Sequence, residues 1–381
     1  MQSEILNYKN EQWEGLSNFS FPKTEVQLIL CFADRALLET STLYDTLKNE
    51  FANAHILTCS TAGEISGRNV ENNSAVIMAI KFDKTTCGFS KGNIKNKKNS
   101  FDLGRNTANL LSKEALKYVL VLSDGNVVNG DELIEGIQSV LDPAVIVSGG
   151  VAGDGDRFQK TLVGLDADIS EGNVVLLGLY GNHIRVGTNY QGGWDVFGPE
   201  KIITKSTGNV LFEIDNENAL DLYKKYLGKY ASELPGSALL FPLSIKSENS
   251  NNFIVRTILS IDEKNKSMTF AGNLPQGSTV RFMKSNFDRL VLAASDAGTK
   301  ATANLENDVK AELAIVVSCV GRKIVLSDRI GEEVDAAIDN ISDGAKIAGF
   351  FSYGEIAPQD KDHRSYLHNQ TITITTLAEL P

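Results

Sequence analysis

A short pattern that returns along the chain limits the folds open to it. Residues 60–65 read STAGEI and residues 351–356 read FSYGEI, and each copy follows an apolar run. A looser third copy, VAGD, ends at Asp154 and also follows an apolar run. Each copy is typical of a strand that ends in a glycine turn carrying one acid. Because ligands bind at the carboxyl ends of strands in α/β sheets, the pattern predicts related units whose acids, Glu64 and Glu355 among them, face a shared site.

Composition excludes several classes of protein. A chain of 381 residues with 42% hydrophobic content has enough apolar side chains for two or three domains. The net charge of −11 disfavours both nucleic acid and anionic membrane surfaces as partners. No apolar run approaches the ~20 residues of a spanning helix, and the polar start MQSE lacks the features of a signal peptide. We therefore expect a cytoplasmic protein.

The cysteines agree with a reducing compartment. Cys31, Cys59, Cys87 and Cys319 form neither a C-x-x-C pair nor a zinc-type spacing. Three of them lie in or beside apolar runs, where a thiol usually acts as a small core side chain. We expect buried, reduced thiols.

Hydrophobic periodicity predicts alternating strands and helices, which indicates an α/β class with mixed sheets and flanking helices. An N-terminal arm over residues 1–21 should be irregular or a short helix. Two halves follow, 22–216 and 217–381, which meet near the stretch 191–200, rich in glycine and aromatic residues. If each half holds one mixed sheet, a four-layer αββα sandwich is one arrangement open to the chain.

Helices are expected from apolar positions at helical spacing at 219–227, at 332–341 and in three further segments. The first covers residues 42–51, and the second covers 131–141. The third covers 288–313, with a break at 296–299.

The acids in the turns permit two interpretations. A carboxylate at a strand end can bind a ligand's ammonium or hydroxyl group, whereas a carboxylate can also cap the backbone N–H groups of its own turn. Single acids in turns mostly follow the second interpretation, but two acids in equivalent turns, Glu64 and Glu355, leave both interpretations equally open. Asp154 and Asp156 do not have the spacing of a calcium-binding loop.

Motifs of nucleotide-binding and hydrolytic proteins are not found. The glycine run at residues 149–153 has neither the lysine of a Walker loop nor the G-x-G-x-x-G spacing, so it is more typical of a tight turn. There is no G-x-S-x-G elbow, and no histidine is placed by sequence to activate Ser123. We do not expect an enzyme.

The histidines do not indicate a zinc site, because H-E-x-x-H is absent. His368, followed by Asn369, enters the last strand within a polar cluster. It is either a ligand contact or a histidine held by neighbouring backbone groups.

Arginines are the best candidates for binding an anionic group. Arg322 follows a strand end and could bind a ligand carboxylate through two hydrogen bonds. The alternative is an ion pair with Glu332 or Glu333. The other candidates are Arg68, Arg157 and Arg256.

The chain resembles FIST proteins, with the N-terminal FIST domain over 22–216 and the C-terminal FIST domain over 217–381. The resemblance is carried in order by STAGEISG, GGVAGDGDRFQKT, GWDVFGPE, CVGRKIV, GFFSYGEI and HNQT. It implies a sensory module in signal transduction that binds a small ligand such as an amino acid. With no kinase or cyclase segment in the sequence, the resemblance implies signalling through a separate protein such as a histidine kinase.

The resemblance also implies an alternative. Some standalone relatives are haem-binding nitric-oxide sensors that regulate histidine kinases or cyclic-di-GMP enzymes. A haem needs an axial side chain, and His183 or His368 would have to supply it here. Gln191 stands near the position where many relatives have a histidine, which weakens this alternative.

These considerations predict one pocket for an amino-acid-like ligand, without a metal. Carboxylates would bind the ligand's ammonium group, and Arg322 would bind its carboxylate. The predicted ligand-binding residues are Glu64, Asp154, Arg322, Tyr353, Glu355, His368 and Asn369.

Overall fold

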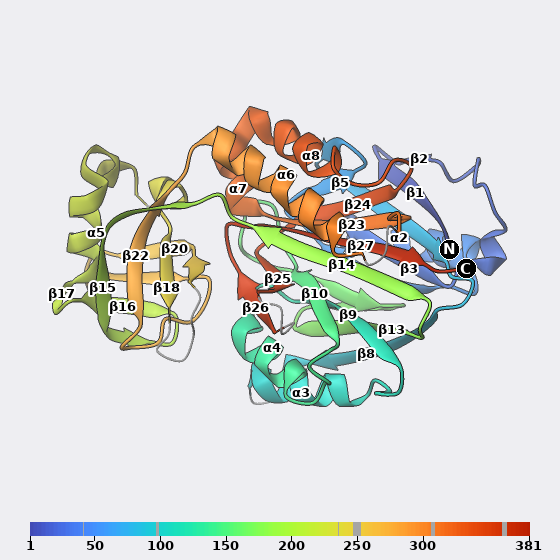
Figure 1. Cartoon of the computed structure of the whole chain (residues 1–381), viewed down its shortest axis with the longest axis horizontal. Helices are drawn as coiled ribbons and strands as arrows, with labels where there is room; N and C mark the ends of the chain where they lie inside the picture. Colours follow the sequence, from blue (N-terminus) through green and yellow to red (C-terminus); the bar gives the residue numbers. More distant parts are fainter. Residues whose placement is uncertain (41, 97–98, 235, 247–252, 306–308, 360–363) are drawn as a thin grey trace.

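The structure is a computed structural model that describes residues 1–381 except 41, 97–98, 235, 247–252, 306–308 and 360–363. It has a large body and a smaller one, the latter formed by residues 195–284 (Figure 1). The large body contains three sheets, and the smaller body contains a fourth. The predicted α/β class with mixed sheets and flanking helices is confirmed.

The large body consists of three units of the same topology. In each unit two parallel strands lie side by side, and two antiparallel strands extend the sheet beyond the first of them. In sheet order, unit 1 contains β4 (His55–Ser60), β3 (Leu28–Ala33), β7 (Ser74–Lys81) and β1 (Gln2–Lys9). Unit 2 contains β10 (Ile146–Val151), β9 (Leu116–Ser123), β13 (Asn173–Tyr180) and β8 (Thr86–Asn93). Unit 3 contains β24 (Lys346–Ser352), β23 (Leu313–Cys319), β27 (Ile372–Glu379) and β14 (Ile184–Gln191).

The three units exchange hairpins in a cycle. The hairpin that follows the second parallel strand of each unit pairs with the sheet of another unit. Unit 1 gives β5 (Glu64–Ser66) and β6 (Asn69–Glu71) to β24, and unit 3 gives β25 (Gly354–Pro358) and β26 (Ser365–His368) to β10. Unit 2 gives β11 (Val163–Leu165) and β12 (Asp168–Ser170) to β4. No unit completes its sheet alone, so the three form one body.

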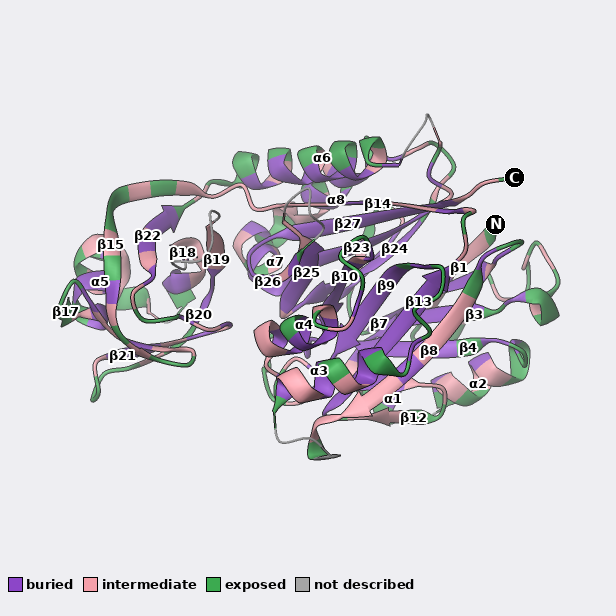
Figure 2. Ribbon diagram, turned by 60° about the horizontal axis from the view of Figure 1, so that its bottom comes forward, coloured by how far each residue is buried: buried purple, intermediate pink, exposed green. Residues whose placement is uncertain are grey.

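The three sheets enclose a common core. The first parallel strand of each unit directs alternate side chains inward, so that Leu30, Leu120 and Ile315 belong to one buried cluster. The side chains between them, such as Cys31 and Val316, pack outward against helices. Strands that are buried on both faces need apolar residues at every position, which explains their continuous apolar runs. Figure 2 shows these strands buried along most of their length. The large body thus has three sheets around one core and not the four-layer αββα sandwich that the sequence left open.

Helices cover the outer face of each sheet. Gly104 and Gly136 let two helices of unit 2 approach closely, because a Cβ at either position would lie within 2.2 Å of a backbone carbonyl oxygen of the other helix. The helices are α1 (Arg35–Glu39) and α2 (Thr42–Glu50) in unit 1, α3 (Ser100–Asn109) and α4 (Gly130–Gln138) in unit 2, and α6 (Phe287–Ala303), α7 (Val320–Leu326) and α8 (Ile330–Ile338) in unit 3.

The smaller body, which we call the insertion domain, interrupts unit 3 between β14 and α6. It has its own apolar core, in which α5 packs on the fourth sheet. Its elements are β15 (Asp195–Thr207), β16 (Val210–Ile214), β17 (Glu217–Asn218), α5 (Ala219–Leu227), β18 (Leu243–Lys246), β19 (Ile254–Arg256), β20 (Ile258–Asp262), β21 (Ser267–Phe270) and β22 (Thr279–Lys284). The remaining elements are β2 (Gln12–Glu14) and short 3-10 helices at Lys23–Glu25, Ile94–Asn96, Gly228–Glu233, Gly236–Leu240 and Ser327–Arg329.

Two predictions about local structure were wrong. The expected irregular or helical arm over residues 1–21 is instead a strand at its start, because β1 pairs along its whole length with β7. The expected break at 296–299 is absent, and α6 runs unbroken through it. Gly298 faces α8 there, where a Cβ would lie 2.0 Å from the carbonyl oxygen of Ala337. This glycine therefore permits close helix packing and does not end the helix.

Candidate ligand-binding site

The three glycine turns meet at one end of the large body. A cycle of backbone hydrogen bonds joins them: Gly153 N to Ser60 O at 2.9 Å, Ala62 N to Phe351 O at 2.8 Å, and Tyr353 N to Val151 O at 3.3 Å. Each turn therefore donates to one turn and accepts from the other. The repeated pattern in the sequence marks this meeting point.

The two glutamates of the turns are bound by hydroxyl groups of their own units. Glu64 accepts hydrogen bonds from Thr61 and, at 2.6 Å, from Ser74. Glu355 is held in the same way by hydroxyls from its own turn and from the residue before β27: Ser352 Oγ lies at 2.7 Å and Thr371 Oγ1 at 2.8 Å. Both side chains are buried, and the two carboxyl groups share none of these hydroxyl donors. Each carboxyl thus stabilises its own turn, which is the alternative that the sequence left open.

Burial makes both carboxyl groups weaker acids. It raises the pKa of Glu64 to about 7, against the lowering effect of its two hydroxyl donors. The pKa of Glu355 rises to about 8 for the same reason. Near neutral pH a large fraction of each group is uncharged. Neither is therefore a strong permanent anion.

A cleft of about 740 Å³ opens beside the first turn and is lined by residues of all three units. We call it the strand-end cleft. Its polar lining includes Thr61, Glu64, Asn72, Asp156, Arg157 and Lys323.

Lys323 extends from α7 into this cleft. Its ammonium donates to Ala62 O at 2.6 Å and to the side-chain oxygen of Asn72, and it lies 5.0 Å from the ring centre of Phe351. Burial lowers the pKa of Lys323, whereas the charges of Glu64 and Asp156 raise it. An ammonium has three hydrogens, and two are used here, so one is left for a ligand.

Gly63 makes room for this lysine. Its φ of +126° lies in the region that favours glycine, and a Cβ would lie 2.1 Å from Lys323 Nζ. The glycine of the repeated pattern is therefore required here by both the turn and the lysine.

The lysine is found at only one of the three equivalent positions in the described chain. Backbone hydrogen bonds from Asp34 N to Ser74 O, from Asp124 N to Asn173 O and from Cys319 N to Thr371 O define equivalent strand ends. The residues four positions further along are Leu38, Val128 and Lys323. The cleft is therefore a specialised boundary between units and not a feature of each repeat.

A second cation reaches the cleft through an ion network. Arg157 Nε lies 2.6 Å from Asp154 Oδ1, and its Nη2 lies 3.2 Å from Asp34 Oδ2. Asp154 also accepts from Arg35 Nη1 at 3.0 Å. Asp154 itself is fully buried, so its role in this structure is to hold Arg157 at the edge of the cleft.

Arg322 points away from the cleft. Its guanidinium pairs with Glu333, with Nη2 and Oε2 2.8 Å apart, and both side chains are fully buried. The remaining donors reach the carbonyl oxygens of Leu290, Gly192 and Gln370. The ion pair that the sequence offered as an alternative is present, and it leaves no donor for a ligand carboxylate.

Three further predicted residues lie outside the strand-end cleft. The hydroxyl of Tyr353 accepts from Phe158 N at 3.1 Å, and the two rings stack at 4.5 Å. His368 is stacked on Tyr190 at 3.9 Å. Asn369 is buried, and neither atom of its side-chain amide has a partner among the described residues.

The haem alternative depends on His183 or His368. His368 does not fit the role, because its Nε2 lies 3.2 Å from Ala357 O and one ring face is covered by Tyr190. Burial also lowers the pKa of His368 to about 3, so the ring is neutral. His183 lies on the turn between β13 and β14. The structure places neither histidine on the strand-end cleft.

Sequence reasoning missed Lys323, although it lies next to Arg322 in CVGRKIV. Successive residues on a helix are turned by about 100°, so the two side chains leave α7 in different directions. Arg322 turns inward, and Lys323 turns to the glycine turn of unit 1. What marks Lys323 as a site residue is its position beside the strand-end glycine of another unit. The two residues are far apart in the sequence, and only the fold brings them together.

Comparisons with known proteins place the chain in a family of sensory proteins. The FIST N domain matches residues 27–217 and the FIST C domain matches residues 219–358. The chain therefore belongs to the FIST family, whose domains are sensory domains of signalling proteins. An uncharacterised protein, MJ1623, of Methanocaldococcus jannaschii is 23% identical over 362 residues, covering 84% of this chain and 67% of that protein.

Among solved structures, a cyanuric acid hydrolase from A. caulinodans aligns with all of this chain and 99% of its own. Its sequence identity is 6% and its TM-score is 0.36. A likeness of that strength supports no conclusion about activity. In the described part of the chain, no helix has the length and apolar character needed to cross a membrane.

The thiols lie where the sequence indicated. Cys31, Cys59 and Cys319 are buried and Cys87 is half-buried, and all four are free. Burial raises the pKa of each thiol, to about 12 for Cys31 and Cys87. The prediction of reduced, largely buried cysteines is confirmed.

Proposed function

We propose that this protein is a sensor that binds a small zwitterion, such as an amino acid, in the strand-end cleft. One observation carries the proposal: the Lys323 ammonium enters a cleft rimmed by carboxylates with one hydrogen still to donate. A site with an ammonium and carboxylates suits a ligand that carries both a negative and a positive group. The signal would pass to a separate protein, such as a histidine kinase, and we expect both to be cytoplasmic.

The charges of the cleft suggest how such a ligand would lie. Its carboxylate would accept from Lys323 and from Arg157, whose guanidinium is already oriented by Asp34 and Asp154. Its ammonium would lie toward Asp156, which lines the same cleft. Groups held in place before binding lose little entropy when the ligand arrives, which favours affinity.

The location supports a sensory role. The cleft is lined by the glycine turn of unit 1, by α7 of unit 3 and by the loop of unit 2 that carries Arg157. A ligand there would contact all three units at the point where their turns are linked. It could therefore favour one packing of the units over another, as a ligand does when it binds two states unequally.

The proposal is tested by titrating the full chain with the twenty amino acids in a calorimeter. We expect at least one of them to bind. The amine and acid analogues of that amino acid, each lacking one charge, should bind more weakly by about tenfold or more, since each loses one ionic contact. No binding by any amino acid would contradict the proposal, as would analogues that bind equally well.

Variants locate the binding. Lys323→Met should abolish it, whereas Lys117→Met, which removes an exposed lysine on β9, should not. Lys323 also donates hydrogen bonds within the protein, so its replacement can disturb the fold as well as the binding. Asp156→Asn therefore serves as a second variant. Asp156 is exposed, so its replacement should weaken binding without changing the melting temperature. Binding that survives both Lys323→Met and Asp156→Asn would place the ligand elsewhere.

A further inference from the structure

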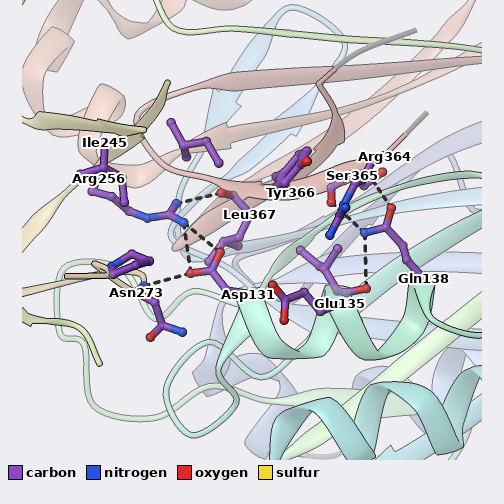
Figure 3. A pocket seen from close by; sticks show the side chains of 13 residues that line it. Asp131, Glu135, Gln138, Ile245, Arg256, Asn273, Arg364, Ser365, Tyr366 and Leu367 are labelled. Carbon is purple, nitrogen blue, oxygen red and sulfur yellow. Dashed lines mark hydrogen bonds and ion pairs between the residues drawn. The ribbon is translucent and has the colours of Figure 1, made fainter. Parts of the chain in front are cut away.

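Lys323 differs from the buried arginines of the protein because it lacks a counter-ion. Arg256 of the insertion domain is 3% exposed, and its Nη2 lies 2.9 Å from Asp131 Oδ1 on α4 (Figure 3). Arg322 is fully buried and pairs in the same way with Glu333. Each guanidinium is thus neutralised by a carboxylate beside it. Lys323 forms no such ion pair within the described part of the chain.

The amine of Lys323 is bound by uncharged oxygens. Nζ donates to Ala62 O at 2.6 Å and to the side-chain oxygen of Asn72. Glu64 and Asp156 act on the amine only through their charges at longer range. Taking an ammonium out of water without a counter-ion favours the neutral amine, and burial accordingly lowers the pKa of Lys323.

A neutral amine fits this arrangement. It has two hydrogens and one lone pair, so the two acceptors use both hydrogens and leave the lone pair free. The direction in which an ammonium would donate its third hydrogen is then the direction of the lone pair. A lysine nitrogen with a free lone pair is a nucleophile that attacks carbonyl carbon atoms.

The amine lies on the wall of the strand-end cleft, where a ligand can reach it. Ala62, Gly63 and Asn72 surround Nζ, and all three line the cleft together with Lys323. The ring of Phe351, whose centre is 5.0 Å from Nζ, is fully buried and does not line the cleft. The nucleophile is therefore covered from the interior and open toward the cleft.

Arg157 supplies a place for a carboxylate in the same cleft. Its Nε is bound to Asp154 and its Nη2 to Asp34, whereas its Nη1 has no hydrogen-bond partner among the described residues. The side chain is 37% exposed, so a ligand can reach it. A molecule with a carbonyl group next to a carboxylate thus has one group for the amine of Lys323 and one for this guanidinium.

We propose that Lys323 forms an imine with a 2-oxo acid in the strand-end cleft. Nζ attacks the carbonyl carbon, a C–N bond forms, and the carbonyl oxygen leaves as water with the two hydrogens of the amine. The step needs neither an oxidant nor a reductant, and water reverses it. The carboxylate of the 2-oxo acid accepts from Arg157. This inference rests on the cleft of the proposed function and adds a covalent step to it.

The imine would also change a contact between two units. A neutral imine nitrogen has no hydrogen to donate, so Lys323 loses its bonds to Ala62 O and Asn72 when the adduct forms. These bonds link α7 of unit 3 to the glycine turn and the following loop of unit 1. The ligand thus replaces a contact between units with its own, and such a difference in contacts shifts a conformational equilibrium.

Reductive trapping tests the proposal on the unmodified full chain. The protein is incubated with pyruvate and cyanoborohydride, which transfers a hydride to the imine carbon and fixes the adduct as a secondary amine. Mass spectrometry of the proteolytic peptides then locates the adduct. Lys323 should react faster than the exposed Lys117 by about tenfold or more, because each unit by which a lysine pKa falls gives tenfold more neutral amine near pH 7. Equal labelling of the two lysines, or none of Lys323, overturns the proposal.

Methyl pyruvate tests whether the carboxylate is recognised. It keeps the carbonyl group without the charge, so the preference for Lys323 over Lys117 should decrease by about tenfold or more. Arg157→Gln should cause a similar decrease with pyruvate and none with methyl pyruvate. Arg105→Gln, at an exposed arginine, is the control and should change neither. An equal preference with both compounds in the unmodified protein overturns the proposed ligand class.

These readouts involve no amino acid. A negative result therefore rejects the imine and leaves zwitterion binding in the cleft open. Failure of the twenty amino acids to bind would reject the zwitterion and would not prevent an adduct at Lys323.

Discussion

Arg322 Nη2 lies 2.8 Å from Glu333 Oε2, and both side chains are fully buried. The pair joins α7 to α8, and Arg322 also donates to Leu290 O on α6 at 2.8 Å and to Gly192 O, just before the insertion domain. Ser318 Oγ donates to the other oxygen of Glu333 at 2.7 Å. One ion pair thus connects the helices of unit 3 with the segment that leads to the insertion domain.

Removing the charge of Glu333 should strongly destabilise the protein. Glu333→Gln leaves the Arg322 guanidinium buried without its counter-ion, and breaking such a pair costs about 3–5 kcal/mol. The adjacent residue provides the control, because Glu332 forms an exposed pair with Arg329 at 2.6 Å. Glu332→Gln should leave the free energy of unfolding nearly unchanged, because solvent screens an exposed ion pair. Urea unfolding measures the free energy of unfolding of both variants. Equal losses of stability would show that the buried pair contributes no more than the exposed one.

This pair also shows how far a sequence can be interpreted. That Arg322 follows a strand end was evident from the chain, and Glu333 was one of its two possible partners. The choice between a ligand and an ion pair depends on how α7 packs against α8, which residue types do not determine. The strands were predictable because their side chains are apolar at nearly every position. The exchange of hairpins was not, because it depends on pairing between distant segments.

The candidate site divides in the same way. The repeated turns located the end of the body where the units meet, and Glu64 does line the strand-end cleft. The predicted gathering of seven residues is not found: Arg322 and Glu355 are occupied within the protein. A buried carboxyl and a carboxyl that faces a ligand can share one sequence pattern, since hydroxyl donors in the fold decide between them.

Gly63→Ala should disturb both stability and binding. The position has φ +126°, and the new methyl group would meet Lys323 Nζ at 2.1 Å. We expect a loss of about 1–3 kcal/mol from backbone strain, together with displacement of the lysine. Gly67→Ala is the control, because Gly67 has φ +54° and open space around it. It should cost about 1 kcal/mol or less. Thermal melts compare the two, and similar melting temperatures would refute the steric argument.

Replacing Asn369 should stabilise the protein or leave it unchanged. Neither amide atom of this buried side chain has a partner among the described residues. Asn369→Leu therefore replaces an unsatisfied amide with an apolar side chain of similar size. We expect a gain of about 0–2 kcal/mol in the free energy of unfolding. Asn173→Leu should instead lose about 1–3 kcal/mol, because Asn173 Nδ2 donates to Val163 O at 3.0 Å. A comparable loss in both variants, measured by urea unfolding, would reveal an unseen partner of Asn369.

Stability should depend on pH through Glu355. Its pKa rises from 4.5 to about 8 on folding, mainly through burial, so the folded state holds more protons between these values. The free energy of unfolding therefore decreases as pH rises through that range. Glu355→Gln stays neutral and can keep hydrogen bonds to Ser352 and Thr371. Its stability relative to the unmodified protein should improve steadily from pH 4.5 to pH 8.

Glu379 provides the opposite case within the same chain. Burial alone would raise its pKa, but hydrogen bonds from the backbone of Asp83, Lys84 and Thr85 lower it to about 2. Its ionised form therefore stabilises the fold above pH 4.5, and that stabilisation is lost as pH falls toward 2. Glu379→Gln should be destabilised at pH 7 and approach the unmodified protein in acid. Urea unfolding of Glu355→Gln and Glu379→Gln at a series of pH values gives the difference in free energy of unfolding between each variant and the unmodified protein. This difference should change with pH in opposite directions for the two variants. A change in the same direction would rule out the opposite pKa shifts of the two carboxyl groups.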